Sequence, residues 1–215
     1  MKLREIADGL AGTYGATNAW RGMGVPQIAA EIQRRCGGIL VALRRDNRDN
    51  LKHFCVDVTA WTFSLCTAAK ADLNSLLARK FPGCCTYCGQ KPCSCGLIKE
   101  SAKSFPYDAE HSLHEWQELL GEIYGEANGH KEFWFLGYKL AEEAAEIVTA
   151  CYHLENSREH FEEEVADLVS WLLAIATFCG FDLEQALLDR YLDFRCCKCD
   201  TSPCVCSPSQ IAEYR

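Results

Sequence analysis

The sequence predicts an all-α fold in which two similar helical units pair to form one bundle. Ala, Leu and Glu are frequent, apolar residues recur at helical spacing, and no alternating strand pattern is visible. The second observation is an internal repeat, and the third is that each copy of the repeat ends in a short cluster of cysteines. Together they indicate a pseudo-dimeric helical bundle in which a small four-cysteine metal loop ends each unit.

Four helices are expected in the first half of the chain. Pro26 suits the first turn of the second helix, because its fixed φ is helical and its missing N–H would have no partner there. The helices are predicted at residues 3–16, 26–45, 49–69 and 72–80.

The second half repeats this order of helices. Gly180 suits a left-handed C-cap between two helices, and Asp182 then caps the N-terminus of the next one. Ser157, with acidic residues nearby, is expected to cap the third helix. The helices are predicted at residues 112–126, 132–155, 159–179 and 182–194.

The two halves align at a shift of 110 residues, which becomes 111 at the cysteine clusters. Asp57 and Trp61 then align with Asp167 and Trp171, and a one-residue deletion before the first cluster reconciles the two shifts. The predicted organisation is one unit at residues 1–95, a linker at 96–111, a second unit at 112–206 and a tail at 207–215.

Ten of the fifteen cysteines fall in the two clusters, and both clusters contain the pattern CxxCxxxPCxC. Four thiolates within eleven residues suit a small tetrahedral Zn²⁺ loop of the structural kind, because no coordination position stays open for substrate. An iron–sulfur cluster is the second interpretation. Disulfides are disfavoured in a reducing compartment. The predicted ligands are Cys85, Cys88, Cys93 and Cys95 in the first cluster and Cys196, Cys199, Cys204 and Cys206 in the second.

The other cysteines divide into two groups. Cys84 and Cys197 adjoin the clusters and could substitute as ligands. The remaining five sit in apolar helical patterns and are expected in the core. They are Cys36, Cys55, Cys66, Cys151 and Cys179.

Two predicted helices of the second half carry carboxylates three residues apart, Glu143 with Glu146 and Glu164 with Asp167. Positions i and i+3 share a helix face, so two such helices packed antiparallel would aim four carboxylates at one point. Four carboxylates cannot all stay ionised there without a cation, and oxygen ligands suit Mg²⁺ or Mn²⁺. A solvated acidic face is the alternative, but these residues adjoin apolar positions that are expected to face a core.

The pattern EExxE, a spacer of under twenty residues and then ExxD resembles the all-α nucleoside triphosphate pyrophosphatases of the MazG-like superfamily. The resemblance covers roughly residues 113–192. It implies two paired MazG-like units and Mg²⁺-dependent cleavage of a nucleotide to its monophosphate and pyrophosphate. Phosphoribosyl-ATP pyrophosphohydrolases are a related alternative. The matching residues are Glu142, Glu143, Glu146, Glu164 and Asp167.

The resemblance implies that Glu143, Glu146, Glu164 and Asp167 hold one or two Mg²⁺ ions, and that one of the glutamates deprotonates the attacking water. Glu142 is the alternative base, although it faces about 100° away from Glu143 on the helix.

Three nearby residues are candidates for binding the nucleotide, and each has a plainer interpretation. Lys139 could hold the triphosphate or form an i,i+4 ion pair with Glu143. Trp171 could stack on the base or pack in the core. Asn128 could contact sugar or phosphate or only form a turn.

The first copy lacks most of the carboxylate set, since only Asp57 is retained. It is expected to be a degenerate partner that completes the bundle, which leaves one nucleotide site per chain. At the shift of 110, the residues aligned with Glu143, Glu146 and Glu164 are Gln33, Cys36 and Phe54.

The formal net charge of −8 argues against nucleic-acid or acidic-membrane binding. The start of the chain lacks the apolar core of a signal peptide, and the longest apolar stretch, residues 168–179, is too short to span a bilayer. We therefore expect a cytoplasmic protein with a nucleotide substrate, for which further homodimerisation is left open. A non-catalytic, zinc-stapled scaffold or nucleotide sensor is the alternative function.

Overall fold

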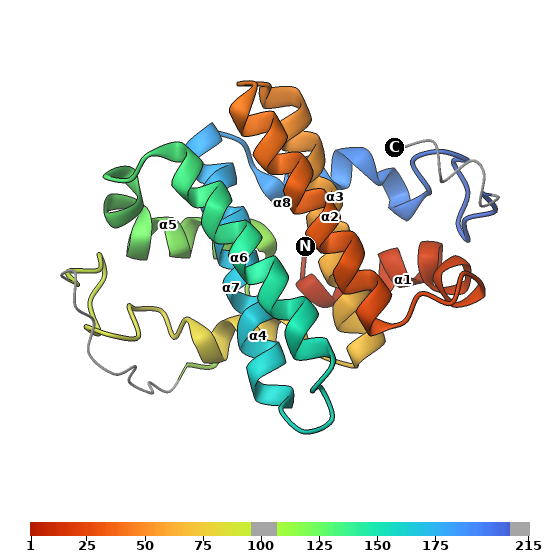
Figure 1. The fold of residues 1–215 in the computed structure, drawn as a ribbon, viewed down its shortest axis with the longest axis horizontal. Coiled ribbons are helices and arrows are strands. Elements are labelled where there is room, and N and C mark those ends of the chain that lie inside the picture. Colours follow the sequence, from red (N-terminus) through yellow and green to blue (C-terminus); the bar gives the residue numbers. More distant parts are fainter. Residues whose placement is uncertain (96–106, 207–215) are drawn as a thin grey trace.

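Two long helices, α2 (Val25–Arg44) and α6 (Phe133–Cys151), cross at the centre of the computed structural model, which describes residues 1–95 and 107–206 (Figure 1). Gly137 of α6 makes the close approach possible, because a Cβ at this position would collide with the side chain of Leu43 on α2. Residues 96–106 of the predicted linker and the predicted tail at 207–215 lie outside the described residues.

Each half builds a similar helical layer on its long central helix. In the first half, α3 (Arg48–Ala69) packs on α2, and α1 (Leu3–Trp20) packs on α3. In the second half, α7 (Arg158–Cys179) packs on α6, and α5 (Leu113–Gly129) packs on α7. The described residues contain no strand, only an isolated bridge between Lys2 and Ser112, so the all-α prediction is confirmed.

The last helix of each half lies on the other half. The short helix α4 (Leu73–Lys80) packs on α7, and α8 (Leu183–Arg190) packs on α3. The residue after each short helix continues this exchange. Phe81 meets Tyr124 of α5 with ring centroids 6.1 Å apart, and Tyr191 meets Tyr14 of α1 at 5.9 Å.

Several predicted helix ends are confirmed. Gly180 ends α7 with a left-handed φ of 72°, and the Asp182 carboxylate accepts a hydrogen bond from the backbone N–H of Gln185 at the start of α8. Pro26 lies in the first turn of α2. Ser157 occupies the predicted N-cap position of α7, but its side chain makes no capping hydrogen bond.

Four predicted helix ends differ from the structure by three residues or more, and one of them is that of α5, which continues past residue 126 to Gly129. Helix α1 continues past residue 16 to Trp20 and turns at Gly22, where φ is +66°. Helix α6 ends at Cys151 and not at 155, since Tyr152 is already largely exposed. Helix α8 ends at Arg190 and not at 194, because the chain turns to bury Tyr191 and forms only a 3-10 turn at Leu192–Phe194.

The core is apolar and continuous through both halves. Four of the five cysteines predicted in the core are buried there, and Cys179 is half-buried; all fifteen cysteines are free thiols. In the described part of the chain, no single helix is long and apolar enough to cross a membrane; α7 and α8 meet that test only together, across a bend of 96°.

The two cysteine loops lie at opposite ends of the molecule (Figure 1). The first loop is held on α5 by a hydrogen bond from the N–H of Cys93 to the carbonyl of Ile123, at 2.7 Å. The second loop is held on α1 by the N–H of Cys204 and the carbonyl of Thr13, at 2.8 Å. Each loop therefore packs on the first helix of the opposite half.

Candidate metal centres and the adjoining cavities

The packing of α6 on α7 brings three of the four predicted carboxylates together. Glu143, Glu164 and Asp167 each offer an oxygen, and these oxygens lie within 4.8 Å of one another. Glu143 and Glu164 are buried and Asp167 is half-buried, so solvent compensates little of their charge. Three oxygen donors at this separation could hold a hard divalent cation.

The fourth predicted carboxylate, Glu146, lies beside this group but outside it. Its residue is exposed, and it is not one of the three whose oxygens converge. It still interacts with Glu164, because the Glu146 carboxylate, as a hydrogen-bond acceptor and as a negative charge, contributes to raising the pKa of Glu164.

The electrostatics of the group favour a bound cation or proton. Burial, reinforced by Glu146 and the neighbouring acids, raises the pKa of Glu164 to about 8. Burial also raises the pKa of Glu143, with the Asp167 charge adding to it. The pKa of Asp167 is raised by burial even though Lys80 opposes the shift. A divalent cation would compensate the negative charge of all three carboxylates.

Lys80 is a site residue that sequence reasoning missed. Its Nζ lies 2.8 Å from Asp167 Oδ2, and it reaches this position because α4 of the first half packs on α7. Burial works against the Lys80 charge, but the hydrogen bond to Asp167 outweighs it and the pKa of Lys80 is raised. The comparison of the two halves could have indicated Lys80, because a basic residue, Arg190, aligns with it at the shift of 110.

A cavity of about 720 Å³ opens beside the carboxylates. Its walls include Glu143, Asp167 and Lys80, whereas Glu146 and Glu164 do not line it. The three residues predicted to bind substrate all line it as well: Asn128, Lys139 and Trp171.

Lys139, Trp171 and Asn128 also contact other side chains of the protein. These contacts agree in part with the alternative interpretations, in which the three residues do not bind substrate. Lys139 Nζ lies 3.4 Å from Glu143 Oε1 and also pairs with Glu142. Trp171 is half-buried, and Lys131 Nζ stands 5.4 Å from its ring centroid. Asn128 Oδ1 is 3.4 Å from the same ammonium group.

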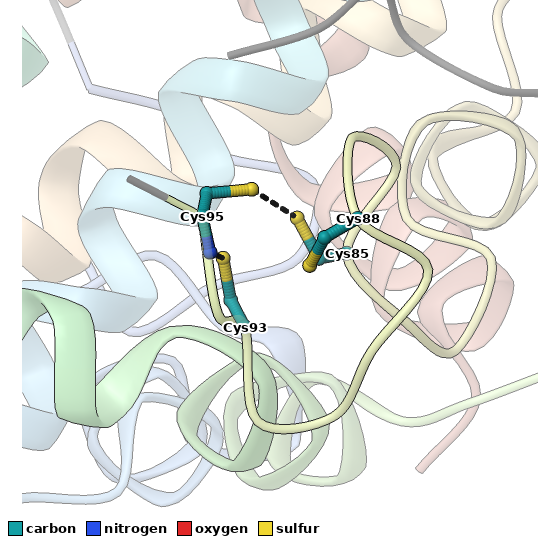
Figure 2. A group of neighbouring side chains, drawn as sticks. All are labelled: Cys85, Cys88, Cys93 and Cys95. Carbon is teal, nitrogen blue, oxygen red and sulfur yellow. Dashed lines mark hydrogen bonds between the residues drawn. The ribbon is translucent and has the colours of Figure 1, made fainter. Parts of the chain in front are cut away.

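The four predicted ligands of the first cysteine loop converge. Cys85 and Cys88 come from one arm of the loop and Cys93 and Cys95 from the other (Figure 2). Their sulfurs lie within 4.8 Å of one another, with 3.6 Å between the sulfurs of Cys85 and Cys95. Burial raises the pKa of Cys88, but backbone hydrogen bonds involving Ser94 and Gln90 outweigh it and lower that pKa to about 6. The loop thus stabilises a thiolate, the form that binds metals.

The second loop repeats this geometry. The sulfurs of Cys196 and Cys206 are 3.8 Å apart, and those of Cys199 and Cys204 are 4.0 Å apart. A hydrogen bond from Thr201 lowers the pKa of Cys199 to about 6. In neither loop does the adjoining Cys84 or Cys197 join the group of four.

The loops also form walls of cavities. The first loop contributes Thr86, Tyr87, Cys93 and Cys95 to the large cavity that contains the carboxylates. The second loop lines a smaller cavity of about 120 Å³ around Asp57.

The surroundings of Asp57 differ from those of Asp167. Its carboxylate lies 3.0 Å from Arg190, 3.4 Å from Arg35 and 3.7 Å from His53. Burial lowers the pKa of His53, and the Arg190 charge acts in the same direction. Cationic side chains therefore occupy the space around this carboxylate, where Asp167 has further acids.

Comparisons with protein-family models, with curated proteins and with solved structures found no match to this chain.

Proposed function

We propose that this protein is a Mg²⁺-dependent nucleotide pyrophosphohydrolase, which cleaves a nucleoside triphosphate to its monophosphate and pyrophosphate. One observation carries the proposal. Glu143, Glu164 and Asp167 converge at the edge of a cavity of about 720 Å³ that also presents Lys80, Lys139 and Trp171. Carboxylates for a hard cation, ammonium groups for phosphates and an aromatic ring for a base are the three parts that such a substrate needs.

In this proposal, Glu143, Glu164 and Asp167 hold the cation, which when bound would neutralise charge developing on the phosphate oxygens. Lys80 and Lys139 bind the triphosphate, and Trp171 stacks on the base. The oxygen of a water molecule bonds to the α-phosphorus, and the bond from that phosphorus to the bridging oxygen breaks. The bridging oxygen leaves with pyrophosphate. One of the glutamates takes the proton of the water.

The proposal includes an internal duplication, with a MazG-like pairing of the two units. It is supported by contacts that recur at positions 110 residues apart. Lys80 pairs with Asp167 as Arg190 pairs with Asp57, and the ring contacts of Phe81 and Tyr191 follow the same rule. The bridge between Lys2 and Ser112 joins two positions that are equivalent at this shift, as expected for a contact on a pseudo-twofold axis.

We further propose that each cysteine loop holds one structural Zn²⁺. A tetrahedral ion with Zn–S bonds of about 2.3 Å needs sulfurs about 3.8 Å apart. The observed separations of 3.6 Å, 3.8 Å and 4.0 Å support that size. A four-iron cluster would bind each thiolate to a different iron and spread the sulfurs more widely.

The test is release of pyrophosphate from a panel of canonical, deoxy and modified nucleoside triphosphates with Mg²⁺ or Mn²⁺. Glu164→Gln removes a carboxylate of the converging group and should abolish turnover. Glu159→Gln changes an exposed acid of the same helix and should leave turnover intact. Full activity of Glu164→Gln would disprove the site. Nucleotide binding without pyrophosphate release by the folded, zinc-loaded protein would support the sensor function in place of the enzyme.

A further inference from the structure

The small cavity around Asp57 has the opposite charge balance from the cavity around Asp167. Its lining contains the basic residues Arg21, Arg35, Arg190 and Lys198, and the one carboxylate is Asp57. Loading the adjoining cysteine loop with Zn²⁺ would add two negative charges, since four thiolates bind one divalent ion. A net positive charge of one would still remain in the lining.

The two inner arginines are incompletely paired. Arg35 and Arg190 share the Asp57 carboxylate, Arg35 also pairs with Glu31, and a terminal nitrogen of Arg190 lies 2.9 Å from His53 Nδ1. Their side chains are only 15% and 22% exposed. Among the described residues, the Nε atom of each is buried and makes no hydrogen bond, although Arg35 Nε lies 3.4 Å from Asp57 Oδ2 within the ion pair. Buried guanidinium charge that is only partly compensated favours a further anion.

The volume of the cavity suits a small anion. About 120 Å³ is room for about four water molecules at about 30 Å³ each, which accommodates one tetrahedral oxyanion. A nucleotide would need a space closer to the 720 Å³ of the other cavity. Guanidinium groups present N–H donors in the planar arrangement that matches the oxygens of phosphate.

We propose that the cavity around Asp57 is a metal-independent binding site for inorganic phosphate. Arg35 and Arg190 supply the inner donors, and Arg21 supplies a donor at the rim. In this site the guanidinium of Arg35 compensates the negative charge of the phosphate. In the other cavity, a cation bound by the carboxylates would have that role. The proposal rests on the geometry of the first half and holds whether or not the protein is a pyrophosphohydrolase.

The experiment is calorimetric titration of inorganic phosphate into zinc-loaded protein, in buffer without Mg²⁺ and without a chelator. We expect saturable binding of one phosphate per chain. Chloride at the same ionic strength should give no such isotherm. Absence of saturable binding, or an equal response to chloride, would overturn the proposal.

Variants locate the bound phosphate. Arg35→Gln and Arg190→Gln should each weaken binding at least tenfold. Arg34→Gln is the matched control, because Arg34 is the neighbouring residue on α2, pairs with the same Glu31 and does not line the cavity. If an inner variant fails to fold, Arg21→Gln at the rim tests the same site. Loss of binding in Lys139→Gln, with binding retained in the arginine variants, would place the anion in the other cavity and contradict the proposal.

Discussion

Lys80 and Asp167 form an ion pair across the two halves of the chain, with 2.8 Å between Nζ and Oδ2. The pair exists because α4 leaves its own half and packs on α7. Arg190 and Asp57 form the matching pair at 3.0 Å. The carboxylate centre is therefore completed by a residue that its own half of the sequence does not contain.

The variant Lys80→Gln should separate the binding of metal from the binding of substrate. Removing a positive charge beside Asp167 should tighten Mg²⁺ binding about tenfold, which corresponds to about 1.4 kcal/mol. Losing an ammonium group from the cavity should raise the KM for the nucleotide by a similar factor. Calorimetry with Mg²⁺ alone and steady-state kinetics at pH 8.5 measure the two effects. The exposed Lys91→Gln should change neither, and equal Mg²⁺ affinity in all three proteins would contradict this role for Lys80.

The stability of the metal-free protein should fall as the pH rises from about 5 to 8. The pKa of Glu164 is about 8 in the folded state against an ordinary value of 4.5, so the folded state binds the proton more tightly. The contribution of such a group is fully present below pH 4.5 and is lost as the pH rises through 8. Thermal denaturation of the metal-free protein against pH measures this. Glu164→Gln should flatten the dependence, and addition of Mg²⁺ should raise Tm more at pH 8.5 than at pH 6. An unchanged pH profile in the variant would show that Glu164 does not titrate as described.

The two cysteine loops should differ in their effect on catalysis. Cys88→Ser and Cys199→Ser each remove one ligand from equivalent positions, and both should lower the zinc content from two ions per chain toward one. Because the first loop lines the large cavity through Thr86, Tyr87, Cys93 and Cys95, Cys88→Ser should also raise the KM for the nucleotide. Cys199→Ser should leave KM unchanged. Zinc analysis beside kinetics tests this, and equal effects of the two variants on KM would contradict the assignment of the first loop as a cavity wall.

The crossing of α2 and α6 should be sensitive to the size of residue 137. Gly137→Val introduces a side chain where a Cβ already meets Leu43, so it should cost about 1–3 kcal/mol of stability. Gly12 is the matched control, because a Cβ at this position in α1 would meet nothing within 4 Å. Gly12→Ala should be stabilising by about 0.5–1 kcal/mol. Urea denaturation of both variants measures the difference, and an undisturbed Gly137→Val would mean that the two helices cross farther apart.

The predictable parts of the fold were those encoded locally. Helical periodicity, Pro26, Gly180 and Asp182 identified helices and several of their ends, because a cap depends on neighbouring residues. Long-range packing was not encoded in this way. The early end of α8 depends on the burial of Tyr191 against Tyr14, a residue from the first helix of the chain.

In the candidate site, too, some features are encoded locally in the sequence and others depend on long-range packing. Helical spacing predicted that Glu143, Glu164 and Asp167 would converge, whereas Glu146 at the same spacing lies outside the group because its face of α6 is exposed. Lys80 could not be assigned from spacing, since it enters the site through the exchange of α4 between halves. Only a comparison of Lys80 with Arg190 within the repeat would have suggested it.

The packing of α4 on the other half has a consequence for the evolution of this protein. A gene fragment that encoded only residues 112–206 would carry every acid of the candidate centre, yet it would lack Lys80 and the cavity wall formed by Thr86 and Tyr87. Selection on the acidic half therefore also constrains α4 and the loop after it.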